Sequence, residues 1–349
     1  MAFTLLCIYS DNPMNILGIE TSCDECSVAV VAEGKTILSN IVASQVEQHA
    51  PWNGVVPEIA SRLHIEWIDE VTSRALIASD LSLKAGINGI AVTYRPGLIG
   101  SLLVGLSYAK GLAWTAGKPW IGVDHIMAHL YAVHLENEIA YPHLGLIVSG
   151  GHTILCRVES IDEVSILGAT IDDACGEAFD KVAKHYEMGY PGGVKLDALA
   201  ENGDPGAFNF PQPRLGARRY DFSYSGLKTA AINQLEKFRT RRAEASSANI
   251  AASFRKAAID MLISRLKLAV EYTGINRVVF GGGVSANRYL RRVVDEDPSL
   301  EAYFPSLALC VDNGAMVAGL GYHLLLKGKR SPLELNAQAR VSKFRRSYP

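Results

Sequence analysis

Apolar and polar residues follow one another in a pattern that predicts an α/β protein. Residues 15–44 contain three apolar runs rich in Val, Ile and Thr, which predicts a strand, a turn and two further strands. A helical period follows at 56–78. The remaining elements predicted before residue 143 are a strand at 87–93, helices at 100–116 and 124–134 with Asp124 as the cap of the latter, and a strand at 119–123.

The same order of elements begins again at residue 143. Residues 143–158 and 163–170 predict three more strands, the first two joined by a glycine turn. The elements predicted after them are helices at 173–188, 193–202, 224–238 and 247–273, a strand, glycine turn and helix at 277–290, and a final helix at 313–327. The two halves therefore repeat a topology, although they do not repeat a sequence.

This internal repetition predicts two similar α/β lobes with a cleft between them. Ligands of such folds bind at the ends of the strands, where glycine turns approach the cleft. The predicted parts are an N-terminal extension at 1–13, a first lobe at 14–142 and a second lobe at 143–349 with a helical insertion at about 172–250.

Composition restricts the class of protein. Hydrophobic residues make up 48% of the chain and charged residues 20%, values typical of soluble globular proteins. The first residues lack the basic region and cleavage site of a signal peptide, and the apolar stretch at 97–116 contains Lys110 and several glycines, so we expect a buried helix there and no membrane span. Six cysteines without a disulfide spacing favour the cytoplasm. We interpret the C-x-x-C formed by Cys23 and Cys26 as a turn between strands, since a redox motif would precede a helix.

The formal net charge of −2 gives no overall basic excess for binding nucleic acid. Basic residues do form local clusters, which consist of Arg214, Arg218 and Arg219; of Lys237, Arg239, Arg241 and Arg242; and of Arg340, Lys343, Arg345 and Arg346. Such runs are most often solvated surface, but an RNA partner would bind patches of this kind.

The clearest candidate for chemistry is the pair His125 and His129. Four residues apart on a helix, the two imidazoles face the same side and can chelate one metal ion, although an isolated pair of this kind also occurs in cores and on surfaces. Zinc peptidases place a glutamate base directly after the first histidine, where this chain has Ile126. Asp312, at a predicted strand-to-helix junction, is either a third ligand or a helix cap. Two histidines and one carboxylate suit iron(II) or zinc.

Two glycine turns are candidate anion-binding sites. The segments IVSGGHT (147–153) and VVFGGGVSANR (278–288) both follow apolar strands, where backbone N–H groups can approach phosphate oxygens. The second turn also opens a helix, whose N-terminus favours anions. Either turn alone is equally consistent with a tight hairpin. Their matching places in the two lobes favour nucleotide binding.

The region 172–193 is less specific. It carries Asp173, Glu177, Asp180 and Lys181 on one predicted helix, which is a solvated surface in most proteins. Asp180, followed by the turn at Gly192 and Gly193, is alternatively a ligand of ribose or amide groups. The segment FSYSGLKT (222–229) adds polar side chains without a specific pattern.

Taken in order, these segments resemble the TsaD family, also called the Gcp or YgjD proteins, from about residue 15 to about residue 330. The matching segments are GIETSCDE (18–25), VVPEIASR (55–62), PGLIGSLLVG (96–105), DHIMAH (124–129), VSGGHT (148–153), IDDACGEAFDKVAK (171–184), YPGG (190–193), FSYSGLKT (222–229), GGGVSANR (281–288) and VDNGAMVA (311–318). Arg95, Cys26 and Leu63 depart from the family's pattern, which commonly has Gly, Thr and Asp there.

The resemblance implies an actin-like ATPase fold of the Hsp70 and sugar-kinase superfamily. It also implies metal-assisted transfer of a threonylcarbamoyl group from threonylcarbamoyl-AMP to N6 of the adenosine 3′ of the anticodon, in tRNAs that read codons beginning with A. By match, the metal ligands are His125, His129 and Asp312, with iron(II) preferred over zinc. By match, the substrate-binding residues are Val148, Ser149, Gly150, Gly151, His152, Asp180, Gly193, Asp197 and Asn287.

The resemblance further implies partner proteins. These are tRNA, a TsaB-like paralogous subunit, a TsaE-like ATPase and an upstream TsaC-like enzyme that makes the adenylate. ATP or ADP is expected to fit the same cleft.

Other functions remain open at this point. An ATP-hydrolysing switch or sugar-kinase-like enzyme of the same fold needs an acidic residue in the first strand to organise Mg²⁺, and Glu20 stands there. A metallopeptidase lacks its base, and a noncatalytic scaffold would not need His125, His129 and Asp312 together.

Overall fold

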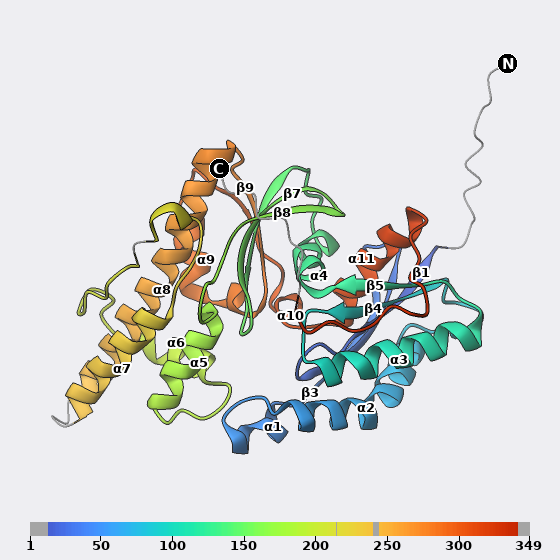
Figure 1. Ribbon diagram of the computed structural model, residues 1–349, viewed down its shortest axis with the longest axis horizontal. Helices are drawn as coiled ribbons and strands as arrows, with labels where there is room; N and C mark the ends of the chain where they lie inside the picture. Colours follow the sequence, from blue (N-terminus) through green and yellow to red (C-terminus); the bar gives the residue numbers. More distant parts are fainter. Residues whose placement is uncertain (1–12, 214, 240–243, 341–349) are drawn as a thin grey trace.

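The computed structural model describes residues 13–213, 215–239 and 244–340 (Figure 1). Residues 1–12 of the predicted extension lie outside this part. So do six residues of the predicted basic clusters, namely Arg214, Arg241, Arg242, Lys343, Arg345 and Arg346.

Two five-stranded sheets with the same topology organise the chain. The first has the order β3-β2-β1-β4-β5, and the second has the order β8-β7-β6-β9-β10. In each sheet the first three strands in the chain are antiparallel neighbours, and the last two continue from the first strand in parallel. The strands are β1 (Asn15–Glu20), β2 (Glu25–Ala32), β3 (Thr36–Ser44), β4 (Gly89–Arg95), β5 (Trp120–Asp124), β6 (His143–Val148), β7 (Thr153–Ser160), β8 (Glu163–Ala169), β9 (Arg277–Gly281) and β10 (Glu301–Tyr303). The predicted repetition of two three-stranded units is confirmed.

The helices connect the strands and cover the sheets. They are α1 (Val46–His49), α2 (Pro57–Ala78), α3 (Ile99–Ala116), α4 (His125–Ala132), α5 (Cys175–His185), α6 (Gly192–Ala200), α7 (Ser225–Arg239), α8 (Glu244–Thr273), α9 (Arg288–Asp295), α10 (Leu307–Cys310) and α11 (Gly314–Leu326). Short 3₁₀ turns occur at Ala50–Trp52, Val133–Leu135, Gly216–Arg218 and Gly283–Ala286. The predicted helices are confirmed to within a few residues, while β10, α1 and α10 were not predicted because each is too short to show a period.

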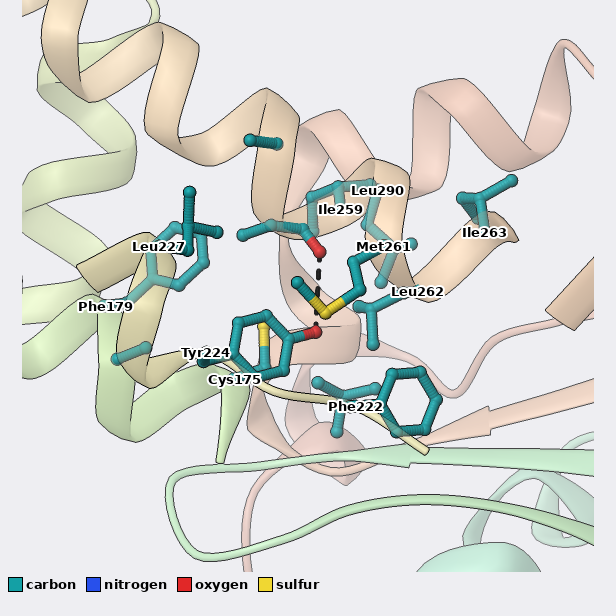
Figure 2. Packing of buried hydrophobic residues seen from close by; sticks show 14 of the residues in the cluster. Cys175, Phe179, Phe222, Tyr224, Leu227, Ile259, Met261, Leu262, Ile263 and Leu290 are labelled. Carbon is teal, nitrogen blue, oxygen red and sulfur yellow. Dashed lines mark hydrogen bonds between the residues drawn. The ribbon is translucent and has the colours of Figure 1, made fainter. Parts of the chain in front are cut away.

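The second lobe carries a thick helical layer. Phe179 of α5, Leu227 of α7 and Met261 of α8 lie in one buried cluster that covers the second sheet, as Figure 2 shows. Tyr224 is fully buried, and its hydroxyl donates to the backbone oxygen of Ala258 at 3.4 Å. This packing holds α5, α6 and α8 as one layer (Figure 1).

Helix α11 crosses from one lobe to the other. It follows the second sheet in the chain but packs on β1, β2 and β4 of the first sheet (Figure 1). The predicted division after residue 142 stays a prediction. The nearly all-apolar sequence of α11 fits its burial among these strands and α4. Close contact requires glycine, because a Cβ on Gly18 would lie 2.2 Å from the backbone oxygen of Gly314.

No helix in the described ranges is long and apolar enough to cross a membrane. The stretch at 97–116 instead forms α3, with Leu102, Leu106 and Ala109 in the core of the first lobe. Cys26 is fully buried in β2, and Cys23 precedes it in the turn, both as free thiols.

Candidate active site

Helix α4 places two histidines on one buried face. It begins at His125, directly after β5, because the Asp124 carboxylate caps it by accepting from the backbone nitrogens of Ile126 and Met127 at 3.0 and 3.3 Å. One turn apart, His125 and His129 have ring centroids separated by 4.5 Å. Asp124 is the helix cap that the sequence predicts.

Asp312 completes the group from the opposite end of the chain. Its Oδ1 lies 3.0 Å from Nε2 of His129 and 3.6 Å from Nε2 of His125. The cap of α11 is the next residue, Asn313, whose side chain accepts from the Met316 nitrogen at 3.0 Å. The side chain of Asp312 is therefore free of the capping role and faces the histidines. One ligand atom from each of the three residues lies within 4.8 Å of the other two.

The charges of this group depend on one another. Burial lowers the pKa of His125, but the negative charges of Asp312 and Glu20 outweigh burial and raise it to about 9. Burial likewise raises the pKa of Asp312, yet the charge of His125 and the hydrogen bond from His129 hold it well below its usual range. The group therefore attracts a proton, and a metal ion would compete with that proton.

Glu20 fixes the orientation of His125. Its fully buried carboxylate accepts from the Ser22 nitrogen and the Thr93 hydroxyl, and it lies 3.2 Å from Nδ1 of His125. Because a carboxylate can only accept, Nδ1 carries the hydrogen, and Nε2 faces Asp312 as the ligand atom. Sequence reasoning considered Glu20 only as an organiser of Mg²⁺.

The residues fit a divalent metal ion. Two imidazole nitrogens and one carboxylate oxygen form a donor set suited to iron(II) or zinc, with positions left for a substrate. His129 faces Asp312 with Nε2, while its buried Nδ1 has no hydrogen-bond partner among the described residues and so lacks the kind of supporting contact that Glu20 gives His125.

His152 joins this group to the first glycine turn. Its ring centroid lies 6.3 Å from that of His125. Burial lowers the pKa of His152 to about 4, and the positive charges of His125 and His129 contribute. The imidazole is therefore neutral at pH 7. It lies at the boundary between the candidate metal ligands and the turn between β6 and β7.

The two glycines of that turn are exposed and border open space. The turn is closed by the Ser149 nitrogen, which donates to the His152 oxygen at 2.8 Å, and by the His152 nitrogen, which donates to the Ser149 hydroxyl at 3.1 Å. A Cβ on Gly150 or Gly151 would meet no atom within 4 Å. Neither packing nor a positive φ demands glycine there, and the lack of a Cβ leaves the backbone N–H groups open to close approach by a ligand.

The second glycine turn lies against the first. Gly282 has φ +84°, and a Cβ there would come within 2.6 Å of the Val148 oxygen. A Cβ on the adjacent Gly283 would meet nothing within 4 Å. The two turns therefore meet at the ends of β6 and β9, which are parallel neighbours in the second sheet.

The other predicted substrate-binding residues form two pairs. Asp180 of α5 accepts from the Gly193 nitrogen at 2.7 Å, and Asp197 of α6 accepts from the Asn287 amide at 2.8 Å. Burial raises the pKa of Asp180. The structure thus joins each predicted carboxylate to a predicted partner from another segment.

The rest of the acidic segment has structural partners. Asp173 pairs with Lys181 at 2.5 Å and with Lys228 at 2.6 Å, and Asp172 accepts from the Tyr224 nitrogen at 2.8 Å at the start of α7. The segment FSYSGLKT therefore ties α7 to α5. Arg255 of α8, which sequence reasoning missed, contacts Asp197; in the sequence nothing distinguishes it from the adjacent Lys256.

Comparison with known proteins assigns the family. Residues 36–319 match the family model described as TsaD, tRNA N6-adenosine threonylcarbamoyltransferase. The chain is 56% identical over 333 residues to the tRNA N6-adenosine threonylcarbamoyltransferase of Treponema denticola, with 95% of this chain and 98% of the relative covered. The chain belongs to the TsaD family. A second TsaD relative, from Borreliella burgdorferi, is 52% identical over 337 residues, with 96% of each chain covered.

Solved structures confirm the actin-like, two-lobed fold. HypF of T. kodakarensis superposes with a TM-score of 0.60 at 16% identity, over 92% of this chain and 49% of that one. Component A of the (R)-2-hydroxyglutaryl-CoA dehydratase of Acidaminococcus fermentans superposes with a TM-score of 0.54 at 15% identity, over 89% of this chain and 98% of that one. These similarities concern the fold alone. Membership of the TsaD family makes the chain a transferase that acts on tRNA.

Proposed function

We propose that this chain transfers the threonylcarbamoyl group of threonylcarbamoyl-AMP to N6 of the adenosine 3′ of the anticodon, in tRNAs that read codons beginning with A, and releases AMP. One observation carries the proposal. The turn at Gly150 and Gly151 borders open space, and its His152 lies beside His125, so a bound nucleotide would extend directly to the candidate metal ligands.

The nucleotide part of the donor binds at the second lobe in this proposal. Backbone N–H groups of glycine turns suit phosphate oxygens, and fixed carboxylates suit hydroxyl and amine donors. The residues assigned to it are Val148, Ser149, Gly150, Gly151, His152, Asp180, Gly193, Asp197 and Asn287.

His125, His129 and Asp312 would hold one divalent cation, iron(II) or zinc. When bound, such a cation supplies Lewis-acid polarisation of a donor oxygen. The donor is a mixed carbamic–phosphoric anhydride, so catalysis mostly needs orientation. The adenosine amine forms a bond to the carbamoyl carbon, the bond from that carbon to the phosphate oxygen breaks, and the amine loses a proton as AMP leaves. The chain's own contribution is to hold the anhydride beside the buried histidine face.

The proposal includes partners and a compartment. A TsaB-like paralogous subunit, a TsaE-like ATPase and a TsaC-like enzyme that supplies the adenylate would act with this chain in the cytoplasm. The anticodon loop is single-stranded, so its adenosine can enter a cleft at small cost. ATP or ADP would occupy the same nucleotide space.

Glu20 argues against the alternative of an ATP-hydrolysing switch or sugar kinase. That chemistry needs a carboxylate on the first strand for Mg²⁺. The Glu20 carboxylate instead accepts from Ser22 and Thr93 and contacts His125.

The test is a transfer assay. The chain, its partners and unmodified tRNA are incubated with threonylcarbamoyl-AMP labelled in the threonine part, and the tRNA is digested to nucleosides. We expect label in threonylcarbamoyladenosine, loss of at least about a hundredfold in a His125→Ala variant, and full activity in His185→Ala, which changes an exposed histidine at the end of α5. Absence of label from the unaltered chain with active partners would refute the proposal.

A further inference from the structure

The carboxylate of Asp197 is held by two donors that share one oxygen. Arg255 of α8 contacts Asp197 Oδ1 through Nη1 at 3.0 Å, and the Asn287 amide nitrogen contacts the same oxygen at 2.8 Å. Asn287 is itself fixed, because its Oδ1 accepts from the Leu290 nitrogen at 2.9 Å and caps α9. These two contacts leave Oδ2 of Asp197 available to a ligand.

Arg255 lies in a site built around its guanidinium. The side chain is only 4% exposed, and its Nη1 also pairs with Glu201, the residue directly after α6. The same Nη1 also contacts the backbone oxygen of Asp197 at 3.3 Å, and Nη2 donates to the backbone oxygen of Ala200 at 3.4 Å. The guanidinium carbon lies 4.9 Å from the centroid of the Tyr289 ring. The oxygen acceptors and the aromatic ring together define the orientation of the planar guanidinium group.

Fold stability alone is a poor reason for this arrangement. A buried ion pair seldom stabilises a protein more than apolar side chains of similar size, since removing both charges from water is costly. In addition, Nε of Arg255 is buried without a hydrogen-bond partner in the described part of the chain. Burying Arg255 costs free energy, and the side chain contacts Asp197, a candidate binding residue. A function at Asp197 would explain why an arginine is present.

We infer that Arg255 is a positioning residue of the nucleotide site, which holds Asp197 so that Oδ2 faces the bound nucleotide. This inference rests on the proposed function, in which Asp197 binds the nucleotide part of the donor. Arg255 offsets the negative charges of Asp197 and Glu201 and fixes the side-chain rotation of Asp197. The Asp197 side chain is then already ordered before the nucleotide binds. Its effect belongs to nucleotide affinity, because the candidate metal ligands lie on α4 and beside α11.

The test measures the affinity of the chain for AMP by titration calorimetry. Arg255→Gln should weaken AMP binding roughly tenfold or more, since it removes a charged hydrogen bond that orders Asp197. Arg255→Lys should weaken it less, because the charge stays while the fork is lost. Lys256→Gln is the matched control on the same helix, where the lysine pairs with Asp260, and it should bind AMP like the parent.

A double-mutant cycle separates positioning from a structural role. If Arg255 acts through Asp197, the Asp197→Asn variant and the double variant with Arg255→Gln should bind AMP equally weakly. In transfer assays Arg255→Lys should raise KM for the adenylate and leave kcat within about twofold. Additive losses, or unchanged AMP binding in a folded Arg255→Lys chain, would overturn the inference and leave the proposed function standing. A parent chain that does not bind AMP would overturn both.

Discussion

The chemical role of a single residue in this protein depends on which atoms surround it. Glu20 stands in the first strand, where a related enzyme class needs a ligand for Mg²⁺, yet its carboxylate is 0% exposed and contacts His125. Burial raises the pKa of Glu20, but the charge of His125 and its hydrogen bond outweigh burial and lower it. The residue is therefore a charged hydrogen-bond partner of a candidate metal ligand.

Replacing Glu20 by Gln should weaken metal binding. The amide keeps the shape but loses the charge that strengthens the hydrogen bond to Nδ1 of His125, and loss of such a partner typically costs about ten- to a hundredfold in metal affinity. Competition between the protein and a coloured chelator for iron(II) or zinc measures this. Glu33→Gln is the control, since Glu33 accepts from the Tyr322 hydroxyl at the turn after β2. Equal affinities in the two variants would contradict the role given to Glu20.

Sequence reasoning found the residues whose signal is local. The spacing of His125 and His129 implies a common helix face, and the two glycine turns follow apolar strands. For Asp312 the residues alone left a third ligand and a helix cap open, and the family resemblance favoured the ligand. The contacts of Glu20 with His125 and of Arg255 with Asp197 join residues 105 and 58 positions apart, so no local pattern contains them.

At the scale of elements, periodicity predicted nearly all strands and helices but not what each helix covers. α11 shows why. Its apolar sequence indicates burial, and nothing in that period tells which sheet buries it. The close approach of Gly18 in β1 to Gly314 in α11 allows the helix to pack on the first sheet. Such complementarity between distant segments is a property of packing and cannot be predicted from a single helix.

Helix α4 gives the prediction that belongs to this scale. The Asp124 carboxylate caps α4 with one oxygen and accepts from Nε of Arg95 at 3.0 Å with the other. Asp124→Ala should lower the free energy of unfolding by about 1–2 kcal/mol through loss of the cap. Asp124→Asn should cost less, because the amide oxygen still accepts from Ile126 and Met127.

Urea denaturation followed by circular dichroism compares the two variants. Arg95 also explains one departure from the family's pattern, because its side chain pairs with Asp124. If Asp124→Ala and Asp124→Asn lower the free energy of unfolding equally, the contact of Asp124 with Arg95, and not the cap, stabilises this end of α4.

At the scale of the whole molecule, the candidate site combines segments of both lobes, because α11 follows the second sheet in the chain and packs on the first. The two sheets have matching strand orders, so the ends of β1 and β6 occupy equivalent places in their lobes. The candidate metal ligands come from α4 and the segment before α11, while the glycine turns belong to the second sheet. The site therefore exists only when both lobes are folded and in contact.

An ion-pair group at the end of α11 adds to that contact. Asp162, in the turn between β7 and β8 of the second sheet, pairs with Lys327 and Lys329 at 2.6 Å each. These hydrogen bonds hold the pKa of Asp162 below its ordinary value. A carboxyl with a lowered folded-state pKa stabilises the fold above its unfolded pKa of about 3.9, and the stabilisation is lost as the pH falls below that value.

Asp162→Asn should therefore lower the free energy of unfolding at pH 7 by only about 0.5–1 kcal/mol, because both lysines are partly solvated. Calorimetric scans at several pH values should show the variant and the parent converging as the pH falls below about 4. Asp260→Asn is the control, since its ion pair with Lys256 lies within one helix and should contribute about half as much or less. If the two substitutions cost the same at pH 7, the contact between the second sheet and α11 does not depend on Asp162, and apolar packing such as that of α4 on the second sheet holds the lobes together.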